Sequence, residues 1–337
     1  MEKVRKTKQT ADGTRRAHGF LAWMDEMVVR HQQQGRPGTA SSYRNTRRSL
    51  AAFLDSTRHQ EISLRKVDAR LLSDYQTHLL RGGCCRNTVA CHLRNLRAAY
   101  NEALREGLTA LSRTGHPFEN MLTKPVPTRK RAVPSDLIRR LRSLDIRAAL
   151  VRSGRDPGRK TFSKTLSDLE FARDTFIFSF FACGLPFVDF AYLRPANLQG
   201  DRLCYERHKT GRYIEMELLP EMRVILRRHA VAGGHYLFPV ISSPSPLEAY
   251  RQYIRALRKY NHKLRMLSAL LGDGVQLTTY VVRHSWATTV YHHNMPVAYI
   301  SERMGHTSEK TTRTYLKSFE RSQIDEAHKR ILRSIFT

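Results

Sequence analysis

Residues 278–290 read TTYVVRHSWATTV, and residues 301–319 read SERMGHTSEKTTRTYLKSF. We expect these stretches to form two helix-loop segments, which carry Arg283, His284, His306 and Tyr315. Each residue taken alone has an ordinary structural use: an arginine on a surface, a histidine that caps a helix, or a tyrosine packed with its hydroxyl bonded. Their occurrence together favours a chemical site in the C-terminal part of the chain.

A β-hairpin is predicted upstream of these segments, at residues 203–218 (LCYERHKTGRYIEMEL). Apolar and acidic residues alternate along its second half, and a period of two is typical of a half-buried strand. The turn is expected near Thr210 and Gly211, next to Lys209. The hairpin therefore adds a lysine to the candidate site residues.

Together, VVRHSWAT, MGHTSEKTTRTY and the hairpin HKTG resemble the motifs of the tyrosine recombinases, the phage integrase family of DNA strand-exchange enzymes. The set is specific although each member alone is weak, and the resemblance covers nearly the whole chain. It implies a helical core-binding domain, a linker and a catalytic domain. The fold expected is mainly α with a small antiparallel β-sheet (an α+β catalytic domain), in the form of a C-shaped DNA clamp.

The resemblance also implies roles for single residues. In this family a tyrosine attacks a DNA phosphate, forms a 3′-phosphotyrosyl linkage and releases a 5′-hydroxyl. Tyr315 matches that nucleophile, and Arg283 matches the second catalytic arginine. Lys209 matches the hairpin lysine that protonates the leaving oxygen, and His306 matches the position whose side chain hydrogen-bonds the phosphate.

No cofactor is expected for such a reaction. The covalent linkage conserves the energy of the phosphodiester, so strands are exchanged without ATP or a metal ion. The sequence agrees with this, since it contains no P-loop and no evident carboxylate cluster for magnesium.

Two positions depart from the family pattern. The first catalytic arginine of the family follows Gly-Leu, but in GLPFVD (residues 184–189) that place is taken by Pro186. Asp189 still matches the acidic residue three positions later. The usual histidine three residues before the second arginine is Tyr280, which keeps a hydroxyl but not an imidazole. Tyr280 and the neighbouring His284 are included among the candidate catalytic residues.

Another cation is therefore expected to replace the missing arginine. Residues two apart in a strand project to one face, so Arg207 and Lys209 should point together. We predict that Arg207 supplies the missing phosphate contact. Arg173 and Arg194 are the alternatives, and a plain DNA-backbone contact or a solvent-facing strand position is the other reading of Arg207.

The N-terminal part is predicted to be a four-helix bundle with basic edges. Apolar residues recur at helical spacing from Ala17, again after Thr39 or Ser41, after the expected N-cap Asp68, and between Asn87 and Glu106. Side chains on the edges of the second and fourth helices are the predicted DNA contacts: Arg44, Arg47, Arg86, Thr88, His92 and Arg94. Solvating surface charge is the alternative use of these arginines.

The domain boundaries follow from composition. KPVPTRKRAVP (residues 124–134) combines three prolines with four positive charges, which is typical of an extended linker. Helices beyond it are expected at 135–150, 166–183, 187–193, 220–231 and 245–271. We expect a flexible basic arm (1–16), the helical DNA-binding domain (17–112), a linker (113–134), the catalytic domain (135–319) and a tail helix (320–337). The resemblance implies that the tail docks on a neighbouring protomer, and packing on its own domain is the alternative.

The charge of the chain points to a polyanion. The 337 residues include 58 Lys and Arg against 30 Asp and Glu, a net charge of +28. Residues 1–131 hold 25 basic and 11 acidic residues and residues 132–337 hold 33 and 19, so each part carries +14. Charge of one sign on both parts opposes folding unless a polyanion neutralises it, and nucleic acid is the first candidate.

Several other classes of protein are disfavoured. The longest apolar stretch, residues 176–193, is interrupted by Gly184, Pro186 and Asp189, so a buried element is expected rather than a membrane span. No export signal is indicated. Five cysteines without Cys-x-x-Cys pairs suggest neither a disulfide framework nor a zinc site. The expected location is a reducing, bacterial-type cytoplasm, associated with the nucleoid.

The sequence thus favours a site-specific tyrosine recombinase that acts on mobile-element ends or an invertible segment, by integration, excision or inversion. Its expected partners are double-stranded DNA with specific recombination sites and further copies of the chain in a homotetramer. Two alternatives stay open: a type IB topoisomerase-like relaxase, and a non-catalytic DNA-binding regulator on a degenerate recombinase fold. The target sequence and any accessory DNA-bending protein stay open as well.

Overall fold

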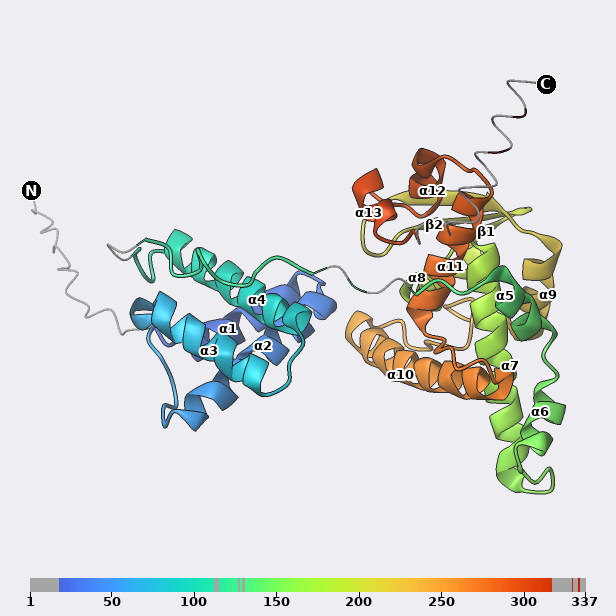
Figure 1. Ribbon diagram of the computed structural model, residues 1–337, viewed down its shortest axis with the longest axis horizontal. Coiled ribbons are helices and arrows are strands. Elements are labelled where there is room, and N and C mark those ends of the chain that lie inside the picture. Colours follow the sequence, from blue (N-terminus) through green and yellow to red (C-terminus); the bar gives the residue numbers. More distant parts are fainter. Residues whose placement is uncertain are drawn as a thin grey trace, which may run out of the picture. The chain divides into compact units, whose positions relative to one another are not determined.

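The chain folds into two units, residues 1–127 and 128–337, each with its own hydrophobic core (Figure 1). The computed structural model describes residues 18–111, 115–126, 128, 131–316, 329 and 333. The arm predicted at 1–16 and the tail predicted at 320–337, apart from 329 and 333, lie outside these residues. The division between the units falls within the linker predicted at 113–134.

The first unit is the predicted helical bundle. Its elements are α1 (Phe20–Gln33), α2 (Pro37–Ser56), the short 3₁₀ helix η1 (Leu64–Lys66), α3 (Ala69–Arg81) and α4 (Arg86–Arg105). Helix α2 begins at Pro37, before the expected start, because proline suits the first turn, where no backbone N–H is needed. Asp68 is the N-cap of α3 as predicted, since its Oδ1 accepts a hydrogen bond from Leu71 N at 2.8 Å.

Residues 115–126 pack on this bundle, although the sequence predicts them as linker. Phe118 is fully buried in the bundle core. The backbone N–H of Leu122 donates to Gln76 Oε1 at 3.0 Å. The side chain of Asn87 forms two hydrogen bonds with the backbone of Val126, at 2.9 and 2.7 Å. The segment that joins the two units is therefore shorter than the linker predicted at 113–134.

The second unit is mainly helical with one small sheet. Its helices are α5 (Ser135–Ser143), α6 (Ile146–Arg152), α7 (Lys160–Phe181), α8 (Phe187–Tyr192), η2 (Pro195–Asn197), α9 (Pro220–His229), α10 (Pro246–Leu271), α11 (Thr279–His292), α12 (Val297–Arg303) and α13 (Glu309–Arg313). Antiparallel strands β1 (Leu198–Gln199), β2 (Arg202–Glu206) and β3 (Tyr213–Glu217) form the sheet in that order. The predicted fold class of a mainly α chain with a small antiparallel sheet is confirmed. In the described part of the chain, no helix combines the length and apolar character needed to cross a bilayer.

Helix α7 is the centre of the second unit. It contacts α5, α6, α9, α10 and α11, and Leu169, Phe176 and Phe178 on it are fully buried. A helix surrounded by others is apolar on most of its faces, which explains the long apolar stretch in the sequence. The chain then turns at Gly184 into the short helix α8. This packing holds α8 and α11, which carry Asp189 and Arg283, against a common support.

Some boundaries differ from those predicted. The helix expected at 135–150 is two helices, because Asp145 caps a new one and its Oδ1 accepts a hydrogen bond from Ala148 N at 2.9 Å. Strand β2 ends at Glu206, so residues 207–212 form the hairpin connection. Strand β1 has only two residues and pairs Leu198 with Leu203, which is too short for a periodic signal.

We expect Phe118→Ala to destabilise the first unit alone by about 3–5 kcal/mol, because it removes a fully buried ring and leaves a cavity. Each unit holds one of the two tryptophans, Trp23 in the first and Trp286 in the second. In a Trp286→Phe background, urea unfolding followed by Trp23 fluorescence should show a lower midpoint. The exposed Leu111→Ala is the control. An unchanged midpoint for Phe118→Ala would show that residues 115–126 do not belong to the bundle core.

Candidate active site

The guanidinium of Arg283 lies buried on α11 and is held by backbone carbonyls. Its two terminal nitrogens donate to Gly184 O at 2.8 Å and to Met304 O at 2.5 Å. Gly184 has φ +72°, and a Cβ there would lie 3.0 Å from Arg283 Cα. Burial, together with the charge of Arg207, lowers the pKa of Arg283 to about 10, so it is still protonated at neutral pH. The glycine thus allows the close approach that fixes this arginine.

His306 lies beside Arg283 in the loop between α12 and α13. Its Nε2 is 3.0 Å from the Arg283 guanidinium and its Nδ1 is 2.8 Å from Thr312 Oγ1. Because a guanidinium only donates, Nε2 accepts, and Nδ1 carries the proton that it donates to Thr312. Burial, followed by the charges of Arg283 and Arg207, lowers the pKa of His306 to about 3. The imidazole is therefore neutral in the DNA-free protein.

Arg207 forms a buried ion pair with Asp189 of α8. One of its terminal nitrogens donates to Asp189 Oδ2 at 2.7 Å, and the two side chains are 6% and 1% exposed. The backbone N–H of His208 donates to the other carboxylate oxygen at 2.8 Å. Burial raises the pKa of Asp189, and the charge of Arg207 opposes that effect. The Nε of Arg207 is buried and has no hydrogen-bond partner among the described residues.

The predicted reason for the position of Arg207 is wrong. Arg207 and Lys209 do not lie in a strand, because the backbone N–H groups of Thr210 and Gly211 both donate to Arg207 O and close a turn. In this turn Arg207 is buried while Lys209 is exposed. The carboxylate of Asp189, not strand alternation, draws Arg207 inward.

Gly305 brings the hairpin connection to the loop that carries His306. It has φ +64°, and a Cβ there would lie 2.7 Å from Arg207 Cγ, so only glycine fits. The hydroxyl of Thr210 donates to Gly305 O at 3.1 Å. The charge of Lys209 contributes to the lowered pKa of His306, which places this exposed lysine within electrostatic reach of the imidazole.

Tyr315 follows α13 and its ring completes the cluster. The ring stacks on that of His306, with centroids 5.1 Å apart and planes 28° apart, and the Arg283 Cζ lies 5.5 Å from its centroid. The ring of His284 lies 4.7 Å away on another side, and its Nδ1 is 3.0 Å from the backbone oxygen of Tyr315. His284 therefore contacts both the ring and the backbone oxygen of Tyr315, whereas Arg283 and His306 contact the ring.

The other candidates lie elsewhere. Tyr280 is 56% exposed, one helical turn before Arg283. Arg173 binds Asp174 and Leu144 O, and the exposed Arg194 has its Cζ 5.8 Å from the centroid of Tyr236. Neither arginine belongs to the cluster around Arg283.

The predicted DNA contacts of the first unit all lie on α2 and α4. Arg44 is half-buried, and Arg86, Thr88 and Arg94 are exposed. Arg47 pairs with Asp25 at 3.1 Å. His92 Nδ1 is 2.9 Å from Thr46 Oγ1, so this histidine takes part in the packing of α4 on α2.

Three residues of the site were not singled out in the sequence: Thr210, Gly305 and Thr312. Their sequence signal is weak, because each lies inside a motif beside a more distinctive residue. Thr210 and Gly305 hold the hairpin turn against the loop of His306, and Thr312 fixes the tautomer of His306. No rule of sequence spacing reveals such roles.

The arrangement suits an anion. Among the described residues, Arg207, Lys209, Arg212 and Arg283 bring four positive charges within reach of His306, against the carboxylate of Asp189, and His306 itself is neutral. Arg207 and Arg283 are buried, and an uncompensated charge in the interior costs free energy. An oxyanion such as a phosphate would supply the missing negative charge, and the phenol of Tyr315 would lie beside it.

Two family models match the chain. Residues 19–115 match the model of the phage integrase SAM-like domain, and residues 199–321 match the model of the phage integrase family. No curated protein sequence matches the chain.

Solved structures share the fold. A lambda integrase dimer bound to a core site has a TM-score of 0.59 at 15% identity, covering 90% of this chain and 97% of that one. The Tn1549 transposon integrase with circular intermediate DNA has a TM-score of 0.56 at 15% identity, covering 93% and 99%. A lambda integrase tetramer bound to a Holliday junction has a TM-score of 0.54 at 15% identity, covering 90% and 78%.

We expect His306 to stay neutral from pH 8 to about pH 4 in the DNA-free protein, because its pKa is about 3. Nitrogen NMR of histidine-labelled protein would show this, with the His306→Gln spectrum as the assignment control. The folded pKa lies below the unfolded value of about 6.5, so the unfolded state gains a proton first and stability falls as pH drops from 6.5 toward 3. A midpoint above pH 5 would contradict the described contacts.

Proposed function

The chain belongs to the phage integrase family of tyrosine recombinases, and on this premise we propose that it cleaves and rejoins DNA at specific sites through a 3′-phosphotyrosyl intermediate. The observation that carries the proposal is the packing of the Tyr315 ring against Arg283 and His306. A phosphate bound by these two residues would lie next to the phenol. Proximity of this kind supplies a large part of the barrier reduction in transfer reactions.

The proposed step is a transesterification. The oxygen of Tyr315 attacks phosphorus, the bond from phosphorus to the 5′-oxygen breaks, and the phenol releases its proton to water as the 3′-phosphotyrosine forms. Lys209 donates a proton to the leaving 5′-oxygen. The hydrogen bond from Thr210 to Gly305 O supports this role, because it ties the lysine turn to the loop that carries His306.

Arg207 and Arg283 are the proposed ligands of the non-bridging phosphate oxygens. Negative charge develops on these oxygens as phosphorus becomes five-coordinate, and preorganised donors stabilise it. Arg283 is fixed by two backbone carbonyls and Arg207 by Asp189, so both are already ordered before DNA binds. Arg207 would thus supply the cation that the family places at the position of Pro186.

His306 is proposed to donate a hydrogen bond to the phosphate, which requires a proton on Nε2. Thr312 permits this change, because a hydroxyl that accepts from Nδ1 in one tautomer donates to it in the other. A bound phosphate would also offset the cations that lower the pKa of His306. Either change makes Nε2 a donor only when the anion is present.

DNA is the proposed partner of both units. The net charge of +14 on each part of the chain suits phosphate contacts, which set register, and a minority of side chains would read base edges. We expect the contacts of the first unit at Arg44, Arg47, Arg86, Thr88, His92 and Arg94. The similarity to a lambda integrase tetramer bound to a Holliday junction supports a homotetramer as the active assembly.

A non-catalytic regulator is the second candidate, and Pro186 is the observation that favours it. If no other cation reached the phosphate, the site would bind DNA without cleaving it. The buried Arg207 argues for cleavage, because it provides a second guanidinium beside Arg283.

We expect the protein to become covalently trapped on its cognate site when a nick beside the cleavage position lets the cut strand diffuse away. Tyr315→Phe should abolish the SDS-stable complex, because it removes the attacking oxygen. Tyr299→Phe, on α12, is the matched control and should trap normally. Equal trapping by Tyr315→Phe would exclude that nucleophile, and no trapping by the wild type on a confirmed site would favour the regulator.

We expect Arg207→Ala and Arg207→Lys to slow cleavage by about 100-fold to 1000-fold, the usual cost of one preorganised donor, with little change in binding at low salt. Single-turnover cleavage of the nicked site and a gel-shift titration measure the two effects. Arg152→Ala removes an exposed positive charge from α6, outside the site, and is the control.

Loss of Arg207 leaves Asp189 buried without its partner, which can unfold the protein. The double variant Arg207→Met with Asp189→Asn removes both charges and separates the two effects. It should fold, as judged by Trp286 fluorescence, and still fail to cleave. Cleavage at the wild-type rate, or a loss confined to affinity, would refute the role of Arg207.

A further inference from the structure

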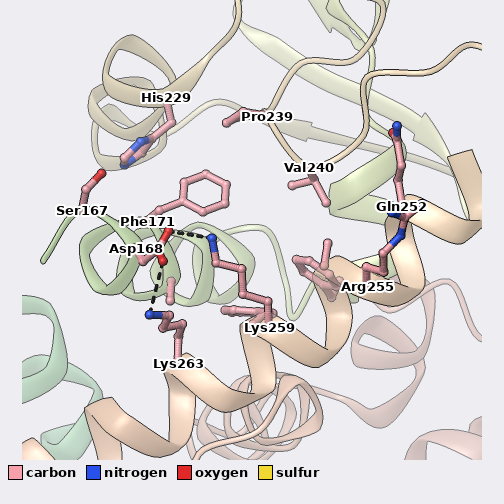
Figure 2. A pocket seen from close by; sticks show the side chains of 14 residues that line it. Ser167, Asp168, Phe171, His229, Pro239, Val240, Gln252, Arg255, Lys259 and Lys263 are labelled. Atoms are coloured by element: carbon pink, nitrogen blue, oxygen red, sulfur yellow. Dashed lines mark hydrogen bonds and ion pairs between the residues drawn. The ribbon is translucent and has the colours of Figure 1, made fainter. Parts of the chain in front are cut away.

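A cavity of about 530 Å³ lies in the second unit, between α7, α8, the end of α9, α10 and the loop at residues 239–240 (Figure 2). Its size falls within the range of sites that bind small molecules. None of the residues proposed for DNA cleavage lines it. The proposed cleavage reaction therefore does not involve this cavity.

Aromatic and apolar side chains form much of the wall: Phe171, Ala172, Phe187, Pro239, Val240 and Ala256. The ring centroids of Phe187 and Tyr260 are 4.6 Å apart, and Phe171 meets His229 edge to face at 5.1 Å. Flat, apolar surfaces of this kind suit a planar ring, which stacks on them or meets them by its edge.

The polar part of the lining carries an excess of positive charge. Asp168 binds Lys259 Nζ at 2.7 Å and Lys263 Nζ at 3.2 Å, and Figure 2 shows both lysines reaching the same carboxylate. One carboxylate balances only one of the two ammonium groups. Lys263 is only 13% exposed at its side chain, so water screens its charge poorly. The third cation of the lining, Arg255, is paired with Glu248 at 2.7 Å.

Tyr260 supplies an unused hydrogen-bond donor. It lines the cavity, is 7% exposed, and its hydroxyl has no hydrogen-bond partner among the described residues. Burial raises its pKa, so the hydroxyl keeps its proton. A buried hydroxyl without a partner is costly, and an acceptor atom on a bound molecule would remove that cost.

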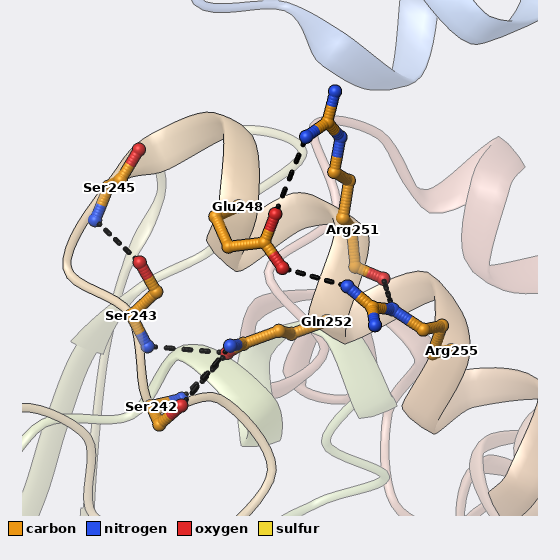
Figure 3. A network of polar contacts seen from close by, with 7 residues as sticks. All are labelled: Ser242, Ser243, Ser245, Glu248, Arg251, Gln252 and Arg255. Atoms are coloured by element: carbon orange, nitrogen blue, oxygen red, sulfur yellow. Dashed lines mark hydrogen bonds and ion pairs between the residues drawn. The ribbon is translucent and has the colours of Figure 1, made fainter.

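The rim of the cavity is held in place before any ligand arrives. Gln252 Oε1 accepts the backbone N–H groups of Ser242 and Ser243 at 2.8 and 3.2 Å, and its Nε2 donates to Ser242 Oγ at 3.1 Å (Figure 3). Glu248 pairs with Arg251 and Arg255 on the same helix. Because loop and helix are already fixed, a ligand would lose little free energy in ordering them.

We propose that this cavity binds a small aromatic anion, with its ring against Phe171 and Phe187 and its acidic group on Lys259 and Lys263. An acceptor atom on the ring system takes the hydrogen bond of Tyr260. The excess positive charge disfavours a cation of the same shape. Phe187 begins α8, the helix that carries Asp189, so the ligand contacts the element that holds Arg207. The binding itself does not depend on DNA cleavage.

The test uses three probes of one shape: a hydroxynaphthalene sulfonate, the uncharged naphthol, and the hydroxynaphthyl-methylammonium. Calorimetric titration of the full-length protein should show binding of the sulfonate, at least about tenfold weaker binding of the ammonium, and intermediate binding of the naphthol. Tenfold corresponds to about 1.4 kcal/mol, within the range of one charge interaction near a protein surface.

Two variants test the contacts of the anion. Lys263→Met and Tyr260→Phe should each weaken the sulfonate about tenfold, and Tyr260→Phe should not lower the melting temperature, since it removes an unpartnered hydroxyl. The controls are Lys164→Met on α7 and Tyr250→Phe on α10, neither of which lines the cavity. Equal binding of the three probes, no binding of the sulfonate, or equal loss in the control variants would overturn the proposal.

Discussion

Two buried guanidinium groups lie near one buried carboxylate, and much of the second unit is arranged around that imbalance. Arg283 and Arg207 are both buried, and within the part of the chain that the structure describes Asp189 is the one carboxylate paired with either of them. Burial, followed by the charge of Arg207, lowers the pKa of Arg283, and burial, followed by the charges of both arginines, lowers the pKa of His306. Buried charges of one sign persist only when other groups compensate them. Here backbone carbonyls compensate part of the positive charge, and a bound phosphate would compensate the remainder.

That requirement explains why distant segments converge. The carbonyls that receive Arg283 belong to Gly184, before α8, and to Met304, after α12. Both arginines lie against glycines with positive φ, Gly184 and Gly305, because a side chain at either position would meet the arginine. Motifs more than a hundred residues apart are thus joined by contacts between backbone and guanidinium. The same contacts bring the tyrosine segment against the cations.

The sequence predicted those parts that follow a local rule. Helical periodicity located α1 to α4, and the motif spacing brought out Arg283, His306 and Tyr315, which do lie together. It failed where the deciding interaction is not local. Arg207 reaches the site through an ion pair across 18 residues rather than through strand alternation. The cavity beside α8 has no signature either, since its walls come from four helices and a loop that are separated in the chain.

Pro186 borders this site and occupies the position where the family has its first catalytic arginine. Proline at this position is the N-cap of α8 and cannot hold a charge, yet Asp189 three residues later is still buried and still needs a cation. The carboxylate is satisfied by Arg207 from the hairpin turn, and Gly305 leaves the space for that side chain. Had the chain merely lost an arginine, Asp189 would be an unpaired buried charge, which is strongly destabilising. The ion pair between Asp189 and Arg207 instead places a second guanidinium near Arg283. The structure therefore favours a site in which the hairpin turn, rather than the start of α8, supplies the second cation. It fits a site that has lost this cation less well.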